Sequence, residues 1–417
     1  MAERIVVVGA GIVGVTAALE LRRRGAEVTV IDRTGVAAEA SRGNAGAFAL
    51  TDVVPLASPG TVAAAVRWLI DPRGPLAIPP AYAPRLVPWL WRFWRATAAS
   101  RADAASAAQA ALMARSSAAL EELVARHALD HFLRRAGQLE LHDSARSFAQ
   151  GTGARDRAAA HGVRVVPLTS AGAIAEIQPG LAPQFTHGAY YPDWINVTDP
   201  ARWTEHLAQL FLAAGGRIER AAVEALEPQA GGVRLRTASG VRDADRVVVA
   251  AGAWSHHLAR TVGDRVPLET ERGYNTTLPA GAFDLRLHLT FADHGFVASR
   301  IGDGVRIGGG VELAGLARPP DMRRARLFLD KARGFLPGLD ASGGTEWMGF
   351  RPSTPDTLPV IGPSPRAPRI LYAFGHGHLG LTQSAGTAAI MADLATGRAP
   401  GLDLAPYRPG RFAPARG

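Results

Sequence analysis

The sequence predicts an α/β protein in which a discontinuous, Rossmann-like dinucleotide-binding domain carries an inserted α+β domain built on an antiparallel sheet. A strand, glycine turn, helix and second strand fill residues 4–33, and buried-strand patterns return at 247–251 and 370–374. Between them, residues 265–312 hold several short alternating strands with little helix, as in antiparallel sheets. We assign the cofactor domain to residues 1–50, 201–262 and 346–417, and the substrate domain to residues 51–200 and 263–345.

The first strand–helix–strand unit has the glycine spacing of a dinucleotide site. Gly9 allows a tight turn after the apolar strand, Gly11 lets a pyrophosphate approach the backbone, and Gly14 lets the helix pack closely on the strand. Asp32 ends the second strand, where a carboxylate can accept hydrogen bonds from ribose hydroxyls. These residues predict a dinucleotide but do not distinguish NAD from FAD.

Composition excludes several classes of function. The 417 residues are 47% hydrophobic, which is enough for two domains, and the formal net charge is +9. The arginines are spread along the chain, so we expect no nucleic-acid partner and rather an attraction for anionic substrates or membrane surfaces. Cysteine is absent, which excludes disulfides, thiolate catalysis and attachment of a flavin through sulfur. We expect no metal, no leader and no membrane span, hence a cytoplasmic protein.

The segments between these units are less regular. Residues 53–94 are rich in Pro and Trp and resemble neither a strand nor a repeat, whereas residues 101–128 predict one long alanine-rich helix. Asp199 and Pro200 form a strong helix start, with an N-cap acid followed by Pro at N1. Short strands are expected in GQLEL, VRVVPL, HGAYYP, RIERAAVEAL and VRLRTA, the last two completing the cofactor domain.

A second glycine loop follows the strand expected at Ile370–Phe374. The run Gly375–Gly380 leads into a helix with many small residues, which would place a helix N-terminus at the redox end of a cofactor. A reduced flavin carries negative charge near N1 and O2 that such an N-terminus stabilises, whereas nicotinamide develops no such anion. The alternative is an ordinary strand–turn–helix whose glycines serve packing.

Taken together, these segments resemble the D-amino-acid oxidase (DAO) family of flavoproteins and are most similar to its bacterial D-amino-acid dehydrogenases. The shared segments run in order along the whole chain: GAGIVG with Asp32, ASRGNAG, AAGAWS, GFRPSTPDTLPVIG and GHGHLGLT. The resemblance implies non-covalent FAD and hydride transfer from the Cα of an amino acid to flavin N5. The imino acid product would hydrolyse to a 2-oxo acid, and the electrons would pass to quinone or another acceptor.

The resemblance also implies which residues surround the cofactor. The first glycine turn would hold the pyrophosphate, Asp32 the ribose, Val223 the adenine and the loop 375–380 the flavin ring. The full implied set is Gly9, Gly11, Ile12, Val13, Gly14, Asp32, Arg33, Ser41, Asn44, Val223, Gly252, Trp254, Gly375, Gly377, His378, Leu379 and Gly380.

Four residues are implied for the substrate. Arg351 in GFRP would pair with the substrate carboxylate, because a planar guanidinium grips a carboxylate through two parallel hydrogen bonds; alternatively it ties down the turn at 354–356. Tyr274 would roof the substrate or donate a hydrogen bond, unless it is a core or rim tyrosine. His294 and His378 would polarise the amine or the flavin, unless they are packing residues.

Several alternatives stay open. Lys331, the only lysine, lies in a helix expected near residues 322–335, away from the motifs, which favours a dehydrogenase over an oxidase that activates oxygen with a lysine. GHGHLG stands where close dehydrogenases have GHGTLG, so imino acids such as D-proline or hydroxyproline remain candidate substrates. The other hypotheses are an oxygen-using flavin amine oxidase and a flavin-binding subunit for assembly or electron relay.

Residues 88–95, PWLWRFWR, mix four aromatic side chains with Arg92 and Arg95. This mixture suits the headgroup boundary of a bilayer, which a quinone-reducing enzyme must reach. The alternative is a helix whose aromatic side chains pack on the substrate domain, and the shortness of the segment favours it. Peripheral contact with the inner face of the cell membrane therefore stays a hypothesis.

Overall fold

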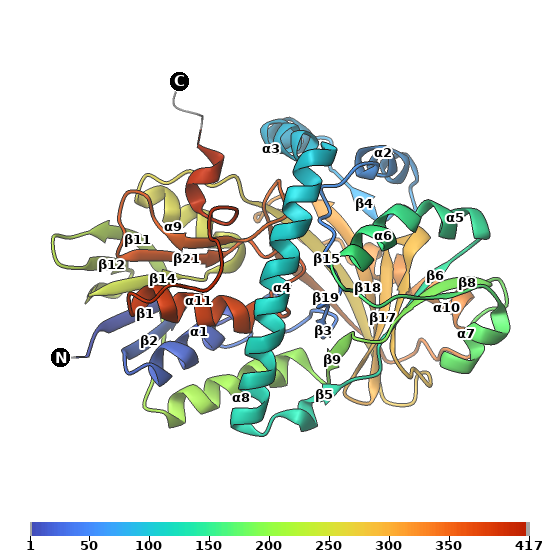
Figure 1. Ribbon diagram of the computed structural model, residues 1–417, viewed down its shortest axis with the longest axis horizontal. Coiled ribbons are helices and arrows are strands. Elements are labelled where there is room, and N and C mark those ends of the chain that lie inside the picture. Colours follow the sequence, from blue (N-terminus) through green and yellow to red (C-terminus); the bar gives the residue numbers. More distant parts are fainter. Residues whose placement is uncertain (1, 414–417) are drawn as a thin grey trace.

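A long helix crosses between two β-sheets in the view of Figure 1. The computed structural model describes residues 2–413. The helix is α4 (Ala99–His127), which confirms the prediction from the alanine-rich run. It packs closely on α11 (Ser384–Ala395), because Gly386 leaves the space that Ser116 occupies.

The first sheet holds the buried core of the nucleotide-binding half. Five of its six strands are parallel, and the last is antiparallel to its neighbour. In spatial order they are β10 (Arg217–Arg220), β2 (Glu27–Asp32), β1 (Arg4–Val8), β14 (Arg246–Val249), β21 (Ile370–Phe374) and β20 (Val360–Pro363). Because they come from three separated stretches of chain, both ends of the sequence meet in one sheet. The predicted α/β fold class is confirmed.

Helices cover this sheet. They are α1 (Ile12–Arg23), α8 (Pro200–Ala213), α9 (Ser255–Thr261) and α11. Helix α8 starts as predicted: the Asp199 carboxylate accepts hydrogen bonds from the backbone N–H groups of Ala201 and Arg202, at 2.8 and 3.1 Å. The cap satisfies two of the backbone donors that a helix start leaves without partners.

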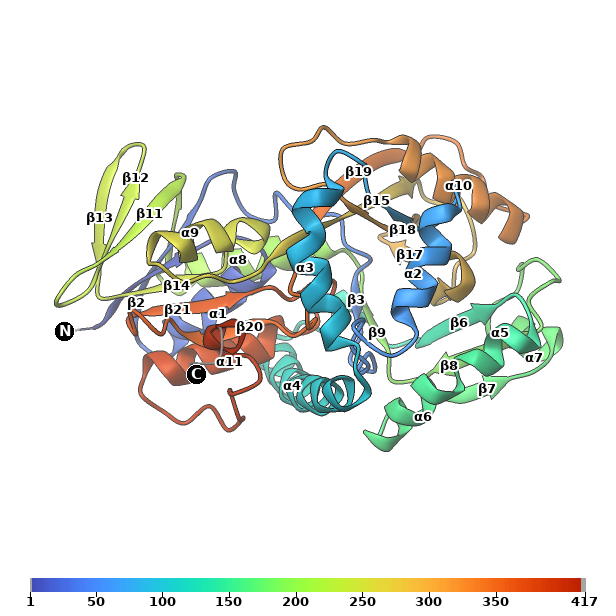
Figure 2. The same cartoon turned by 90° about the horizontal axis from the view of Figure 1, so that it is seen from above.

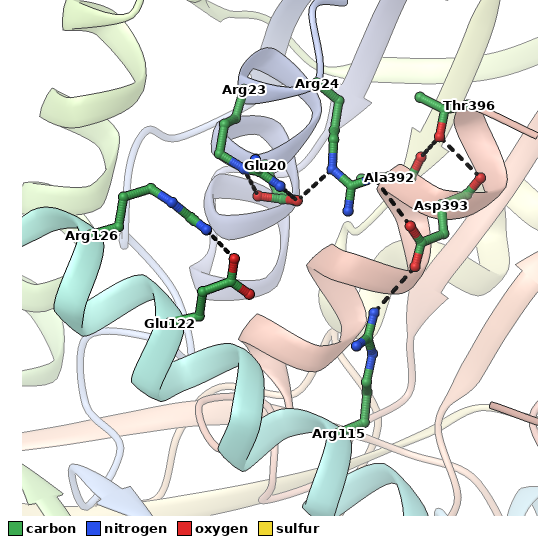
Figure 3. A network of polar contacts seen from close by, with 9 residues as sticks. All are labelled: Glu20, Arg23, Arg24, Arg115, Glu122, Arg126, Ala392, Asp393 and Thr396. Atoms are coloured by element: carbon green, nitrogen blue, oxygen red, sulfur yellow. Dashed lines mark hydrogen bonds and ion pairs between the residues drawn. The ribbon is translucent and has the colours of Figure 1, made fainter. Parts of the chain in front are cut away.

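Charged side chains join three helices at one end of this half (Figure 3). Asp393 of α11 accepts hydrogen bonds from Arg24 of α1 and Arg115 of α4, each at 3.2 Å. Glu20 binds Arg24 on α1 at 2.9 Å. Partly exposed ion pairs contribute roughly 0–1 kcal/mol each, so the apolar contacts beneath them supply most of the stability.

The second sheet is mixed rather than purely antiparallel. Its path is β19 (Thr345–Ser353), β15 (Glu269–Leu278), β18 (Gly304–Leu313), β17 (Phe296–Ile301), β16 (His288–Phe291), β6 (Gln138–His142), β8 (His187–Tyr191) and β7 (Val166–Leu168), with β4 (Leu76–Ala77) beside β18. The prediction of an antiparallel sheet is wrong for two pairs, β16–β6 and β18–β4, which are parallel. Among the short strands expected in residues 265–312, the first is longer than expected: β15 continues unbroken through Gly273 to Leu278.

Helix α10 (Arg323–Phe335) covers one face of this sheet, and a cluster of phenylalanines packs beneath it. Three short helices lie near the edge of this sheet that β8 and β7 form (Figure 1). They are α5 (Ala145–Gln150), α6 (Thr152–Ala160) and α7 (Ala171–Ile177). Two small sheets complete the fold: β11 (Val223–Pro228), β12 (Val233–Thr237) and β13 (Gly240–Ala244), and β3 (Ala47–Phe48), β9 (Ile195–Val197) and β5 (Leu133–Arg134). Of the strands expected in RIERAAVEAL and VRLRTA, β10 joins the first sheet, whereas β11 and β12 form a separate small sheet with β13.

Residues 53–94, for which the sequence predicts neither strand nor repeat, contain two helices. They are α2 (Thr61–Ile70) and α3 (Ala83–Ala96), which lie at the top of the molecule in Figure 1; seen from above in Figure 2, α2 lies over β17 and β18, and α3 lies between the two halves. Among residues 2–413, no helix has the length and apolar character needed to cross a bilayer. The domain boundaries proposed from the sequence stay a prediction.

Candidate active site

A cavity of about 1240 Å³ is lined by residues of both large sheets and of α2 and α3. Pockets for small ligands measure roughly 300–1,000 Å³, so this cavity has room for a dinucleotide together with a small substrate. One end borders the first glycine turn, and the other borders β15, β18 and β19. We refer to these as the nucleotide end and the substrate end.

The glycine turn after β1 is built without room for side chains. Gly9 has φ of +113°, and a Cβ atom there would lie 2.7 Å from the carbonyl carbon of Ala250. A Cβ atom on Gly14 would collide with the carbonyl oxygen of Gly9. Helix α1 therefore begins directly over the strand, with Gly11, Ile12 and Val13 in the cavity lining. Such a turn brings backbone N–H groups and the positive end of the helix dipole to a phosphate.

Asp32 lies in the lining, but its carboxylate is already engaged. Oδ2 accepts a hydrogen bond from the Ala10 N–H at 2.8 Å. Oδ1 accepts from the Thr34 N–H and hydroxyl, at 2.8 and 3.0 Å, and from the Gly35 N–H at 2.9 Å. Asp32 therefore ties the Ala10 turn to the turn at residues 34–35, and Oδ2, which accepts only one of these bonds, keeps a lone pair for a ribose hydroxyl.

The loop at 41–44 closes over the start of α1. The Ser41 hydroxyl accepts a hydrogen bond from the Ile12 N–H at 2.9 Å, and the Asn44 amide donates to the Ser41 carbonyl at 3.0 Å. Arg306 of β18, which the sequence reasoning missed, donates to the Asn44 carbonyl at 2.5 Å. Burial lowers the pKa of Arg306 to about 10, so it remains a cation at neutral pH. An arginine of the second sheet therefore fixes the loop at residues 41–44, which borders the nucleotide end.

Four more residues that the resemblance implies for the cofactor line the cavity. Val223, Gly252 and Trp254 are in the lining, as is Arg33. The Arg33 guanidinium lies 3.6 Å from the centre of the Trp254 ring and 2.6 Å from the Glu39 carboxylate. The cation and the indole together form one wall of the cavity.

The GHGHLG loop reaches the cavity in part. Gly377, His378 and Gly380 line it, whereas Gly375 and Leu379 lie behind it. Helix α11 starts at Ser384, so a further turn separates the loop from the helix. His376 also borders the cavity but is 3% exposed, with Nε2 3.0 Å from the Thr387 hydroxyl, and burial lowers its pKa to about 3. It is a neutral packing residue.

Arg351 reaches the cavity from β19. Its guanidinium lies over Gly273 of the neighbouring strand, where a Cβ atom would be 2.5 Å from Cζ of Arg351. Nη1 donates a hydrogen bond to the Gly310 carbonyl at 2.8 Å. Burial lowers the pKa of Arg351, and the charge of Glu271 opposes that shift. Asp356 in the following turn pairs with Arg411 at 2.8 Å, so the turn is tied by Arg411.

His378 pairs with Asp52 at the rim of the substrate end. Its Nε2 lies 2.9 Å from Asp52 Oδ2, and the ring faces the cavity. Burial alone would lower its pKa, yet the hydrogen bond and charge of Asp52, with the charge of Glu271, raise it above the ordinary value. A protonated His378 adds positive charge to a cavity that already holds Arg351.

Two predicted residues are engaged elsewhere. Tyr274 borders the cavity, but its hydroxyl donates to Glu312 at 2.5 Å and accepts from the Asp321 N–H at 3.2 Å. Burial and Glu312 raise its pKa, and it is 1% exposed, so it is placed as a core tyrosine. His294 is not in the lining; its Nε2 lies 2.8 Å from Asp143, and its ring packs on Phe335.

The sequence reasoning missed other residues of the substrate end. They are Asp52, Glu271, His288 and Trp347. Burial lowers the pKa of His288 to about 3, so it is neutral. A period-2 pattern could have found Glu271, since residues 271, 273 and 275 of β15 all line the cavity.

Known proteins share this architecture and sequence. Residues 4–394 match the DAO family model, described as FAD dependent oxidoreductase. A D-amino-acid oxidase of Bradyrhizobium diazoefficiens is 35% identical over 98% of this chain and 99% of its own length. A D-amino acid dehydrogenase of Cereibacter sphaeroides is 36% identical over 98% and 95%. Glycine oxidase from Geobacillus kaustophilus has the same fold, with a TM-score of 0.77 and 23% identity over 99% of this chain and all of that one. The chain therefore belongs to the DAO family of FAD-dependent oxidoreductases.

Proposed function

We propose that this chain is a dehydrogenase that oxidises the Cα–N bond of D-amino acids and passes the electrons to quinone or another acceptor. The observation that carries the proposal is Arg351. Its guanidinium faces the cavity, and no carboxylate lies within ion-pair distance of it among residues 2–413. A half-buried cation that lines a cavity without an ion-pair partner suits a substrate that brings its own carboxylate.

FAD is the cofactor of the family, and the residues present fit it. The collisions that a Cβ atom would cause at Gly9 and Gly14 leave a backbone surface open to a pyrophosphate, and the same cavity continues to the GHGHLG loop. Gly9, Gly11, Ser41 and Asn44 would hold the nucleotide half, and Gly377 to Gly380 the ring. Bound FAD supplies the acceptor for the two electrons that leave Cα.

The chain's own residues bind and orient the substrate. The Gly310 carbonyl fixes one nitrogen of Arg351, so the others can give two parallel hydrogen bonds to a carboxylate in one orientation. Burial opposes protonation of His378, but Asp52 raises its pKa above the ordinary value, which favours the cationic form that attracts this anion; burial lowers the pKa of His288 and of His376 to about 3, so these two add no charge. Holding Cα in one orientation is a large part of the rate enhancement in reactions of this type.

An anaerobic screen tests the proposal. Purified protein should be yellow, and D-amino acids, with D-proline and D-hydroxyproline among them, should bleach the flavin without oxygen. The L-isomers serve as matched controls. If no amino or imino acid reduces the bound flavin, the proposed activity is wrong and the chain is better explained as a flavin-binding relay subunit.

The acceptor separates a dehydrogenase from an oxidase. Lys331 lies outside the cavity lining, and its ammonium donates a hydrogen bond to the Arg73 carbonyl at 2.6 Å, which supports the dehydrogenase. The relative named as an oxidase supports the second candidate, an oxygen-using amine oxidase. Turnover with a soluble quinone should exceed turnover with oxygen alone; peroxide formed at the full rate of substrate oxidation would identify the oxidase.

We also propose that α2 and α3 dock on an anionic membrane, where a quinone is reached. Both helices border the cavity and expose large apolar side chains, and neither contains an acidic residue. The exposed side chains are Val62, Val66, Leu69 and Ile70 of α2 and Val87, Trp91 and Trp94 of α3. Arg67, Arg85, Arg92 and Arg95 supply the positive charge.

Flotation with liposomes tests the docking. The protein should float with vesicles that contain anionic lipid, and the double variant Trp91→Ser with Trp94→Ser should float less. Recovery of all protein in the soluble fraction, with and without anionic lipid, would contradict it.

A further inference from the structure

Glu271 is a buried acid at the substrate end whose partner is missing from the protein. The residue is 6% exposed and lines the cavity. Within the described part of the chain, no hydrogen bond or ion pair reaches its carboxylate. Arg351 is its direct partner in the antiparallel pairing of β15 with β19, so the two side chains leave the sheet as cross-strand neighbours.

Glu312, which is buried on β18, and Glu269, which is half-buried on β15, both have partners, which sets Glu271 apart. Glu312 of β18 accepts a hydrogen bond from Tyr274 and lies 3.5 Å from Arg272. Glu269, two residues before Glu271 on β15, accepts from the Tyr82 hydroxyl at 3.1 Å and from the Thr270 N–H at 2.8 Å. Since a buried carboxylate is costly unless it is paired, a partner for Glu271 must come from the cavity.

We propose that Glu271 binds the amino group of the substrate, so that Arg351 and Glu271 together recognise an amino-acid zwitterion. This inference rests on the proposed function. An amino acid carries its carboxylate and its ammonium on the same carbon, and adjacent side chains of opposite charge match that arrangement. A secondary ammonium keeps an N–H group, so cyclic imino acids are accepted too.

The pairing also favours release of the product. The 2-oxo acid keeps the carboxylate that Arg351 binds but has no ammonium for Glu271. It therefore leaves the Glu271 carboxylate without a partner and brings a second negative charge near it. The site then discriminates between a substrate and a product that share one carboxylate.

The test compares a ligand that has both groups with one that has the carboxylate alone. D-Alanine affinity is taken from the concentration dependence of anaerobic flavin reduction, and propionate affinity from its perturbation of the flavin spectrum. In Glu271→Gln we expect D-alanine affinity to fall at least tenfold, with propionate binding unchanged or tighter. Equal weakening of both ligands would mean that Glu271 only positions Arg351, and no change in either would equally overturn the proposal.

A matched variant on the same strand and the wild-type enzyme serve as controls for Glu271→Gln. Glu269→Gln makes the same change on the same strand outside the cavity lining and should leave the ratio of the two affinities unchanged. If Glu271→Gln does not retain FAD, the comparison is made with the wild-type enzyme. The proposal requires wild type to bind D-alanine at least tenfold more tightly than propionate at neutral pH, and a smaller difference would overturn it. If no amino acid reduces the wild-type flavin, the proposed function fails instead, and propionate binding shows whether the carboxylate site exists.

Discussion

The two ends of the cavity are built on different principles. At the nucleotide end, both oxygens of Asp32 accept hydrogen bonds from the protein, and Gly9 and Gly14 lie against backbone. At the substrate end, Arg351 has one hydrogen bond to protein and Glu271 has none among the described residues. The nucleotide end is therefore shaped by backbone whose hydrogen bonds are made within the protein. The substrate end instead presents the charged side chains of Arg351 and Glu271 to a ligand. Substitutions should therefore damage the fold and cofactor at one end, and substrate binding alone at the other.

Gly14→Ala should have the largest effect. Its Cβ would collide with the Gly9 carbonyl, and neither backbone can move without opening the β1–α1 contact. Overpacking of this kind costs about 3 kcal/mol, which corresponds to roughly 100-fold in FAD affinity. Titration of apoprotein with FAD measures it. Gly153→Ala in α6 has open space around the new methyl group and should bind FAD normally.

Gly273→Ala should damage the substrate end only. The new methyl group would displace the Arg351 guanidinium, which is the flexible end of a side chain, so the backbone can stay in place. Hydrogen bonds to charged groups contribute about 1.5–3 kcal/mol, so substrate affinity should fall roughly 10- to 100-fold with FAD content unchanged. Gly334→Ala in α10 is the matched control. Loss of FAD in Gly273→Ala would show that the two ends are not separable.

Ser41→Ala should have a moderate effect on both stability and cofactor. It removes the acceptor for the Ile12 N–H, a capping interaction that contributes about 1 kcal/mol. We expect that loss in chemical denaturation and about a fivefold weaker FAD affinity. Ser170→Ala removes a similar cap from α7, where the hydroxyl accepts from the Ala173 N–H at 3.1 Å. Ser170→Ala should lose similar stability but keep its FAD affinity. Equal loss of FAD affinity in both variants would mean that the effect of Ser41→Ala comes from reduced stability and not from the cofactor site.

The His378–Asp52 pair should give the smallest effect, visible as a pH dependence. Because the pKa of His378 is raised, the pair stabilises the fold fully below about pH 6.5, and the stabilisation is lost as pH rises through the raised value. In chemical denaturation, the free energy of unfolding should therefore favour wild type over Asp52→Asn by at most about 1 kcal/mol, and this advantage should shrink as the pH rises above about 6.5. A stability advantage that grows with pH would contradict a raised pKa for His378.

The sequence predicts the nucleotide end well because its determinants are local. The glycine turn, Asp32, the Asp199 cap and the helix at 101–128 each depend on residues close together in the chain. Helix α2 was not predicted, and for α3 the sequence offered a helix at residues 88–95 only as the alternative to a membrane-contacting segment, because Pro and Trp in this stretch give no clear helix start or end.

The substrate end depends on strand register, which is long-range. Glu271 and Arg351 are 80 positions apart and become neighbours only through the β15–β19 pairing. The same register places Gly273 beneath the guanidinium and turns the Tyr274 hydroxyl toward Glu312. Motif matching therefore selected Tyr274 and overlooked Glu271, although the two lie three positions apart on one strand.

Anaerobic reduction of the flavin in wild type and Arg351→Ala tests the central claim most directly. The best D-amino acid from the screen is titrated against both proteins, and FAD content is measured in each. We predict equal FAD content and a substrate affinity about 100-fold weaker in the variant, because two charge-assisted hydrogen bonds are lost while the nucleotide end is untouched. Unchanged substrate affinity in Arg351→Ala would contradict the assignment of Arg351 to the carboxylate and, with it, the division of the cavity into two independent ends.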